Sequence, residues 1–357
     1  MGSRYLGKML MDRCRKGVFA AVVCFIELLS PGLAKAQATS RKPAPFTMAV
    51  FQSELYLGDF VAKEKGFDAE HGLEFKFVTP ASGAAAAQLL LAGNVQGWLT
   101  DPLIIITAAS KGQAIKIAGL SAPTLAYNVL VSKDGKWPPA NASFVEKMTA
   151  LKGKTIGVSG IRAGTDNALV LMIKAAGLAE ADIHRIGIGQ QQAAIGQLQG
   201  GSIDAFVSFS LSGDAVIERE TGARLYMSTQ DPDVPASVRA VPGASFAVSA
   251  DFAAQDPQGV TNWLAAEGEA VAWIKAHPDD AAVILDKYVF GGHQIALAKA
   301  VLPNLILTYL ANTPRDFKMS RRQYEGAVNA ATELGIVSAS QQPAYDQIVI
   351  PRAQDHD

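Results

Sequence analysis

Cysteine is nearly absent from this sequence. Its 357 residues include two cysteines, Cys14 and Cys24, and both lie close to the N-terminus. If the segment that holds them is removed, the remaining chain has no disulfide, no thiolate metal site and no cysteine nucleophile. A lipoprotein anchor at Cys24 is disfavoured, because Val23 stands before it where such a signal needs a small residue.

Histidine is scarce as well, and so is an excess of positive charge. The five histidines include no pair at metal-ligand spacing, and the formal net charge is −1. The sequence has no H-x-x-x-H pattern, no G-x-S-x-G turn and no phosphate-binding loop. We therefore expect no metal, no cofactor, no enzymatic activity and no nucleic-acid partner.

What the N-terminus does contain is the pattern of a signal peptide over residues 1–36. Five basic residues precede an apolar stretch, Val18–Leu29, that only Glu27 interrupts, and Ala34-Lys35-Ala36 matches a cleavage site. The stretch is shorter than the ~20 apolar residues of a membrane-spanning helix. We expect cleavage before Gln37 and a periplasmic protein. Without this segment the chain carries 26 basic and 31 acidic side chains, a net charge of −5, so any attraction for anions must be local.

Short apolar runs alternate with capped helical patterns that end in glycine. Asp101-Pro102, for example, places a capping residue and a first-position proline at a helix start. This alternation predicts α/β architecture with mainly parallel sheets and helices on both faces. The predicted strands are Phe46–Phe51, Leu73–Val78, Trp98–Leu99, Asn128–Ser132, Thr155–Ser159, Arg185–Ile188, Ala205–Phe209, Arg224–Met227 and Ser245–Val248. After Asp256-Pro257 only helical patterns follow.

The simplest arrangement is two α/β lobes. Residues 46–122 and 250–350 form lobe I, with the C-terminal helices bracing it, and residues 127–242 form lobe II. Two crossings, Ser121–Ala126 and Pro242–Ser245, connect the lobes, and a double crossing permits hinge closure over a central cleft.

Several segments resemble a known family. The opening stretch Leu55–Phe75, the motif Leu151–Val158, the motif Gly200–Ala205 and the helix junction Ala276–Ala282 resemble ABC-transporter substrate-binding proteins of the nitrate/sulfonate/taurine type, a group that includes thiamine-pyrimidine-precursor-like proteins. The resemblance implies a type II periplasmic-binding-protein fold that delivers a solute to a membrane permease and its ATPase. The enzymes of this group use a cysteine-rich motif that is missing here.

Ligands of open α/β sheets lie beyond the carboxyl ends of the strands, where helix N-termini attract anionic oxygens. In lobe I these loops contain polar residues that also serve as plain helix caps. The candidate ligand-binding residues of lobe I are Gln52, Ser53, Tyr56, Ser82, Gly83, Thr100 and Asp101. Phe51, Trp98 and Tyr127 are further aromatic candidates for an apolar lining.

In lobe II the most informative loop runs from Gly160 to Asp166. Two glycines bend it at a helix start, and Arg162 is its one basic side chain, suited to a bidentate pair with a carboxylate or sulfonate. An exposed surface arginine is the alternative. The candidates of lobe II are Gly160, Arg162, Gly164, Thr165, Asp166, Gln190, Ser208 and Phe209.

From these observations we expect a monomeric extracytoplasmic protein that binds a small organic anion resembling a sulfonate, taurine or nitrate. Two other functions stay open. A sensory receptor would use the same fold and cleft, and a periplasmic enzyme is disfavoured by the missing catalytic motifs.

Overall fold

The computed structural model describes residues 42–124, 127–189, 191–209 and 211–355. The predicted signal segment, residues 1–36, and the candidate Gln190 lie outside the described residues. So do Leu125 and Ala126, which end the first predicted crossing. Pro43–Asp357 form one compact unit.

The first of two five-stranded sheets has the order β2-β1-β3-β10-β4. Strand β1 pairs in parallel with both β2 and β3, whereas β10 runs antiparallel to β3 and β4. Four strands thus share one direction, and the reversed one comes from much later in the chain. The strands are β1 (Ala44–Ala49), β2 (Leu73–Val78), β3 (Gly97–Thr100), β4 (Ile115–Ala122) and β10 (Ala244–Ser249).

The second sheet has the order β7-β6-β8-β5-β9 and repeats this plan. Strand β6 is parallel to β7 and β8, and β5 is the reversed strand between β8 and β9. In each sheet the reversed strand is the first one after the chain crosses over from the other sheet: β5 follows β4, and β10 follows β9. The strands are β5 (Asn128–Val131), β6 (Thr155–Val158), β7 (His184–Gly187), β8 (Ala205–Ser208) and β9 (Arg224–Ser228).

Helices cover both faces of the first sheet, as alternation along its strands requires. Trp98 belongs to an apolar cluster with α4 and α5, and the next residue, Leu99, belongs to a cluster with α2 and α12 (Pro257–Ala276) on the other face. The helices of this part before the crossing are η1 (Glu54–Tyr56), α2 (Leu57–Lys65), α3 (Phe67–Glu70), α4 (Gly83–Leu91) and α5 (Pro102–Ser110).

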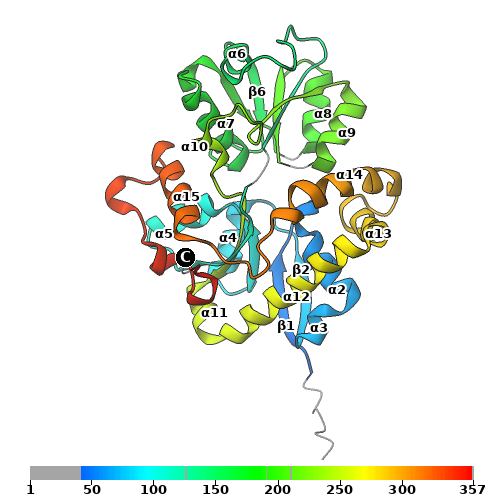
Figure 1. The fold of residues 1–357 in the computed structure, drawn as a ribbon, viewed down its shortest axis with the longest axis vertical. Coiled ribbons are helices and arrows are strands. Elements are labelled where there is room, and N and C mark those ends of the chain that lie inside the picture. Colours follow the sequence, from blue (N-terminus) through cyan, green and yellow to red (C-terminus); the bar gives the residue numbers. More distant parts are fainter. Residues whose placement is uncertain (1–41, 125–126, 190, 210, 356–357) are drawn as a thin grey trace, which may run out of the picture. The chain divides into compact units, whose positions relative to one another are not determined.

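The second sheet is covered in the same way. Val129 and Val131 pack with α7, whereas Leu130 between them packs with α8 and α9. Figure 1 accordingly shows α7 on one side of β6 and α8 with α9 on the other. The helices here are α6 (Phe144–Thr149), α7 (Gly164–Ala175), η2 (Glu180–Asp182), α8 (Gln191–Gln199), α9 (Leu211–Thr221) and α10 (Ala236–Arg239).

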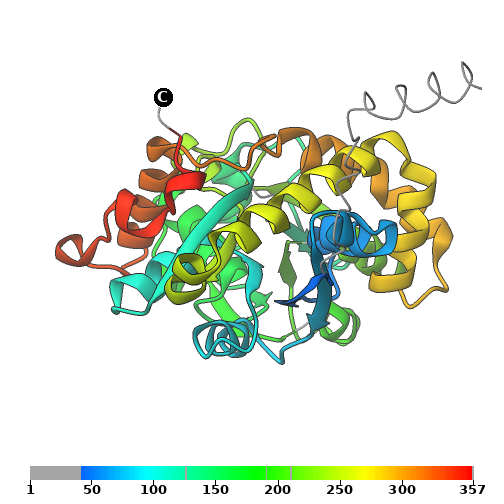
Figure 2. The ribbon, with the colours of Figure 1, turned by 90° about the horizontal axis from the view of Figure 1, so that it is seen from below.

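The C-terminal helices return to the first sheet. Helix α12 contacts α2, α3 and β2, whereas α15 contacts α5. Seen from below, the gold α13 and the orange-red α15 lie on opposite sides of the first sheet (Figure 2). Helix α14, the one described helix whose extended segment is long and apolar enough to span a membrane, packs against α13 and also contacts α9. The remaining elements are α11 (Ala250–Gln255), α12 (Pro257–Ala276), α13 (Pro278–Val289), α14 (Ile295–Thr308), η3 (Leu310–Asn312), α15 (Arg321–Glu333), η4 (Ala339–Gln341), α16 (Tyr345–Ile348) and η5 (Pro351–Ala353).

The predicted fold class is confirmed: the chain is α/β, and its two sheets exchange the chain twice, between β4 and β5 and between β9 and β10. Several elements were not predicted, among them strand β4 and the helices α3, α6, α10, α11 and α16. Strand β4 occupies Ile115–Ala122, directly before the first crossing, and α6 occupies Phe144–Thr149 behind the capping box of Ser143 and Glu146. The sheets are mainly parallel as predicted, with a single reversed strand in each, β10 in the first and β5 in the second.

Candidate functional site

Three predicted residues at the edge of the first sheet are helix caps. The Ser53 hydroxyl accepts from the backbone N–H of Leu55 at 3.3 Å, and the Ser82 hydroxyl accepts from Ala85 at 3.2 Å. The Asp101 carboxylate accepts from Leu103 at 2.8 Å, with Pro102 as the first helical residue. Capping thus uses one oxygen of each side chain.

Helix α7 of the second sheet begins differently. Its N-cap, Ala163, has no side chain to accept a hydrogen bond. The Thr165 hydroxyl is turned back to Ser159, with 2.9 Å to its backbone nitrogen and 2.8 Å to its hydroxyl. The first turn of a twelve-residue helix therefore keeps backbone N–H groups that no side chain of its own cap satisfies, which is the arrangement that favours anions.

Arg162 lies at the tip of this loop and is exposed. Its φ angle of 64° places it in the left-handed region, which a non-glycine residue rarely adopts. Gly160 lies in a bend, as predicted, but the positive φ of the loop falls on Arg162 and on neither Gly160 nor Gly164. A non-glycine residue in this region stores strain of a kind that clusters at functional sites.

Asp166 holds this loop in place from inside. It is 1% exposed, accepts from the backbone N–H of Arg162 at 2.8 Å, and forms an ion pair with Arg185 at 2.7 Å. Arg185 also contacts Glu180 at 2.8 Å. Asp166 therefore positions Arg162 through its backbone, and the Arg185 guanidinium is engaged with two carboxylates.

Loops from the two sheets meet at Asp101, Tyr127 and Gly164. The Tyr127 hydroxyl, directly after the first crossing, donates to Asp101 Oδ2 at 3.3 Å. A methyl group at Gly164 would lie 2.6 Å from Tyr127 Oη and 3.2 Å from Asp101 Oδ2. A cavity of about 20 Å³ remains beside them, lined also by Asn167, which is room for about one water molecule.

Burial changes the pKa values of Asp101 and Tyr127. It raises the pKa of Asp101 to about 6, although the bonds from Leu103 and Tyr127 favour the charged form. Burial likewise raises the pKa of Tyr127 well above 10, and the neighbouring Asp101 charge adds to this effect. In the Asp101–Tyr127 pair, a buried tyrosine hydroxyl thus donates to a buried carboxyl group.

Acidic side chains from the two sheets also influence one another electrostatically. Glu54, in η1 of the first sheet, is 2% exposed and lies near enough to Asp214 of α9 to raise its pKa by repulsion. Ser208, a predicted candidate at the end of β8, is fully buried and hydrogen-bonds to Asp214. Asn128 Nδ2 donates to Asp214 Oδ2 at 2.6 Å.

The aromatic candidates are mostly core residues. The Tyr56 hydroxyl donates to the Leu99 carbonyl at 2.7 Å in a buried position, and Phe51 packs against the Tyr56 ring. Trp98 lies beneath Gly83 at the start of α4 and is 2% exposed. Its indole Nε1–H makes no hydrogen bond of good geometry to any described residue, although the Tyr56 hydroxyl is a polar neighbour.

Three other predicted residues fall at the same edges. Thr100 is buried, Gln52 is exposed and Phe209 is half-buried. The structure thus brings Asp101, Tyr127 and Gly164 together, whereas Ser82, Gly83 and Trp98 gather around the start of α4.

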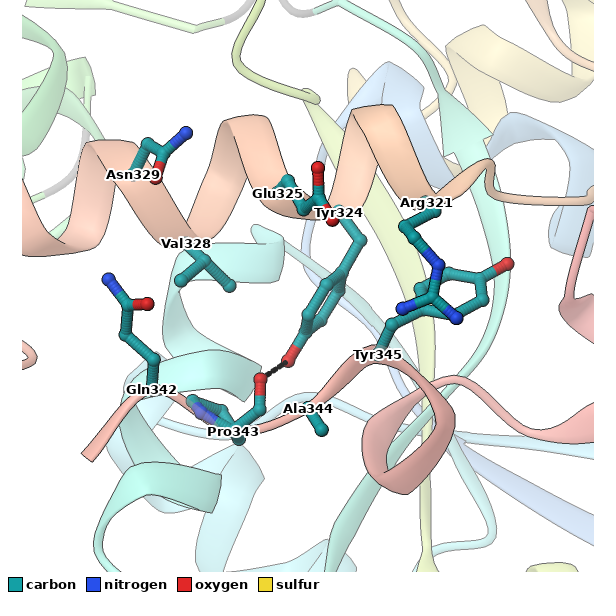
Figure 3. Close-up of a pocket in the computed structure, with 9 residues that line it drawn as sticks. All are labelled: Arg321, Tyr324, Glu325, Val328, Asn329, Gln342, Pro343, Ala344 and Tyr345. Atoms are coloured by element: carbon teal, nitrogen blue, oxygen red, sulfur yellow. Dashed lines mark hydrogen bonds between the residues drawn. The ribbon is translucent and has the colours of Figure 1, made fainter. Parts of the chain in front are cut away.

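A larger hollow lies elsewhere on the protein. It has a volume of about 370 Å³ and is formed by α15 and the segment Gln342–Tyr345. Figure 3 shows the Tyr324 hydroxyl donating to the Pro343 carbonyl across its floor, at 2.7 Å, with Arg321 beside the Tyr345 ring. None of the predicted site residues lines it.

Sequence reasoning missed Glu54, Asn128 and Asp214. A signal existed for each, since Glu54 follows the cap Ser53, Asn128 begins a strand after a crossing, and Asp214 lies in the first turn of a helix. Their nearness to one another depends on how the two sheets face, which no local pattern encodes.

The sequence matches one known protein family. The model of a family described as "NMT1/THI5 like" matches residues 55–281, which is more than half of the chain. No curated protein matches the sequence.

Solved structures share the fold at low sequence identity. The alkanesulfonate-binding protein SsuA from Xanthomonas axonopodis pv. citri, bound to MOPS, superposes with a TM-score of 0.65 at 16% identity and covers 88% of this chain and 99% of its own. The periplasmic aliphatic sulphonate-binding protein SsuA from Escherichia coli gives 0.64 at 17%, covering 83% and 94%.

The periplasmic nitrate-binding protein NrtA from Synechocystis PCC 6803 gives a TM-score of 0.64 at 13% identity and covers 86% of both chains. Proteins named for sulfonate binding and for nitrate binding thus share the fold of this chain. With its two sheets, its double crossing and the match over residues 55–281, the chain belongs to the NMT1/THI5-like family and has the fold of the periplasmic binding proteins.

Proposed function

We propose that the protein is a periplasmic solute-binding protein that captures a small organic anion between two lobes and delivers it to an ABC importer. The observation that carries the proposal is the contact of Asp101 and Tyr127 with Gly164, where the carboxyl-end loops of both sheets meet beside the chain crossings. Ligands of open α/β sheets bind at such edges.

The size of the cavity at this contact implies motion. About 20 Å³ does not admit an organic solute, so capture requires the edges to separate and close again. We propose lobe I as residues 46–122 and 250–350, lobe II as residues 127–242, and the crossings Ser121–Ala126 and Pro242–Ser245 as hinges.

Local features support an anionic group on the solute. Helix α7 starts without a side-chain cap, Arg162 is exposed at its tip, and Trp98 has an indole N–H available near the start of α4. The net charge of the exported chain is negative, so these groups supply the attraction locally. The structural neighbours named for sulfonate and nitrate binding favour the same ligand class.

Native mass spectrometry of the protein purified from its own periplasm tests the proposal. We expect a monomer carrying a small solute, and small-angle scattering should show a decrease in the radius of gyration when that solute is added to the emptied protein. Identical dimensions with and without a saturating solute would refute the hinged receptor, and turnover of the solute would establish an enzyme instead.

A sensory receptor on the same fold is the alternative from another functional class. Crosslinking in intact cells distinguishes the two. An ABC permease with its ATPase is the expected partner, whereas a membrane kinase or chemoreceptor would identify the protein as a sensor.

A further inference from the structure

Asp214 lies at the edge of the second sheet where its register ends. Residues Asn128 of β5 and Ser208 of β8 are directly paired there, and α9 begins just beyond them. Asp214, in the first turn of α9, is 7% exposed and receives hydrogen bonds from both side chains. These polar groups from three elements therefore converge on one carboxyl group.

One oxygen of that carboxyl group is left over. Asn128 Nδ2 lies 2.6 Å from Asp214 Oδ2, but Oδ1 is buried and has no hydrogen-bond partner among the described residues. A buried acceptor without a partner is strongly unfavourable, and a buried ionised one is more so. Since native proteins satisfy most such groups, the exception calls for an occupant that donates.

The charge around Asp214 points to the nature of that occupant. The charged groups that act on Asp214 are Glu54, from across the sheet edges, and Glu218 of its own helix, and both are acidic. No basic side chain of the described residues forms an ion pair with Asp214. An ammonium or amidinium group has several donors and no acceptor, so it satisfies Oδ1 and offsets the repulsion between the acids at once.

We propose that Asp214, with Asn128 and Glu54, forms a subsite for a basic nitrogen on the solute. The inference rests on the proposed receptor function and extends it. The solute then carries an amino or amidino group in addition to its anionic group, the nitrogen lies against α9, and the anion lies toward Arg162 and the starts of α4 and α7.

Three small probes test the subsite, and any two of them have one functional group in common. They are taurine (amine and sulfonate), isethionate (hydroxyl and sulfonate) and ethanolamine (amine and hydroxyl). Calorimetry on the emptied exported protein should show taurine binding at least tenfold more tightly than isethionate. Asp214→Asn should abolish that preference and leave the affinity for isethionate within about twofold. Asp233→Asn, which changes an exposed acid, should retain it.

Several results would overturn the subsite. Isethionate binding as tightly as taurine, or a preference for taurine that survives in Asp214→Asn, removes the amine subsite and leaves the receptor function standing. If neither amine-bearing probe binds while isethionate does, the subsite is equally refuted. If no probe binds and no solute co-purifies, the receptor function fails with it.

A measurement without any probe separates a binding role from a structural one. In the emptied protein at pH 8, Asp214→Asn should melt at the same temperature as wild type or several degrees higher, because it replaces a buried charge by a neutral amide that keeps the Asn128 contact. A melting temperature several degrees lower would mean that the carboxylate is a structural element, and the proposal would fall.

Discussion

Asp101 follows a strand of the first sheet and Gly164 begins a helix of the second sheet's half, yet a methyl group on Gly164 would lie 3.2 Å from Asp101 Oδ2. Tyr127 closes the same contact, because its hydroxyl donates to Asp101 and would lie 2.6 Å from that methyl group. Contacts under 3.0 Å require something to move. The absence of a side chain at position 164 therefore permits the two sheet edges to approach this closely.

Gly164→Ala should hinder closure. We expect solute affinity to fall by about tenfold or more, since the added methyl group forces Tyr127 or the loop aside in the closed form, while the emptied protein keeps its stability. Calorimetry and scattering measure the two effects. Gly196→Ala is the matched control, because Gly196 lies in helix α8 with nothing within 4 Å of the added atom. An alanine at 164 that leaves affinity and closure unchanged would contradict the interpretation.

Arg162 combines an exposed side chain with a strained backbone, so two substitutions separate the two properties. Arg162→Ala should weaken solute binding ten- to a hundredfold, because a charged hydrogen bond contributes about 1.5–3 kcal/mol. Arg162→Gly should weaken binding equally and also stabilise the emptied protein by about 1 kcal/mol, because glycine adopts positive φ without strain. Calorimetry and thermal denaturation provide both numbers.

Arg162→Lys and Arg322→Ala complete that set. Lysine should restore little of the affinity if the guanidinium makes a bidentate contact, since an ammonium cannot reproduce the planar fork. Removing Arg322, an exposed arginine of α15, should have no effect on binding. Unchanged affinity in Arg162→Ala would return Arg162 to the surface and leave backbone amides as the anion site.

The fold was predictable to the extent that its signals are local. Leu73–Val78 is predicted and observed with the same bounds, because alternating apolar residues end at turn residues on both sides. Strand β4 was missed because Ile115–Ala122 contains small residues and a glycine, and it continues toward the crossing without a turn signal. Gly119 is needed there because a side chain would meet Phe317 at 3.1 Å, a residue far away in the sequence.

The loops that carry the candidate site residues could be predicted from the sequence, but the side-chain pairs within the site could not. The caps Ser53, Ser82 and Asp101 follow from residue type and position. That Asp166 pairs with Arg185 depends on the parallel register of β6 and β7, which only the folded sheet fixes. The approach of Glu54 to Asp214 depends in turn on the placement of two whole sheets.

The predicted signal peptide, residues 1–36, lies outside the described part of the chain, but its cleavage can be tested directly. Mass spectrometry of the periplasmic protein should give Gln37 as its first residue. Ala36→Arg should block cleavage and leave the precursor at the membrane, because the position before the cut takes a small residue. Ala38→Arg lies after the cut and should be processed normally. A periplasmic protein that still begins at Met1 would contradict the signal peptide.

Asp59 of α2 and Glu267 of α12 form a buried pair of acids that predicts how stability changes with pH. They are 2% and 4% exposed, they hydrogen-bond to each other, and Asp59 also accepts from Trp263 Nε1 at 3.0 Å. Burial raises the pKa of Asp59 to about 6, and burial together with the Asp59 charge raises that of Glu267 well above 4.5. The folded protein therefore retains protons that the unfolded chain releases near pH 4.

Stability should consequently fall as the pH rises from about 4 through 6 and beyond, because each raised pKa contributes stability only while the folded state holds its proton. Glu267→Gln removes one titration and still offers Asp59 an N–H donor, so the variant should lose less stability than wild type between pH 5 and pH 8. One pKa unit corresponds to about 1.4 kcal/mol, which predicts a difference of at least a few degrees in melting temperature at pH 8. Glu70→Gln, an exposed change in the neighbouring helix α3, should follow the wild-type slope. Thermal denaturation across this range decides the matter, and equal slopes for Glu267→Gln and wild type would show that the pair does not share a proton.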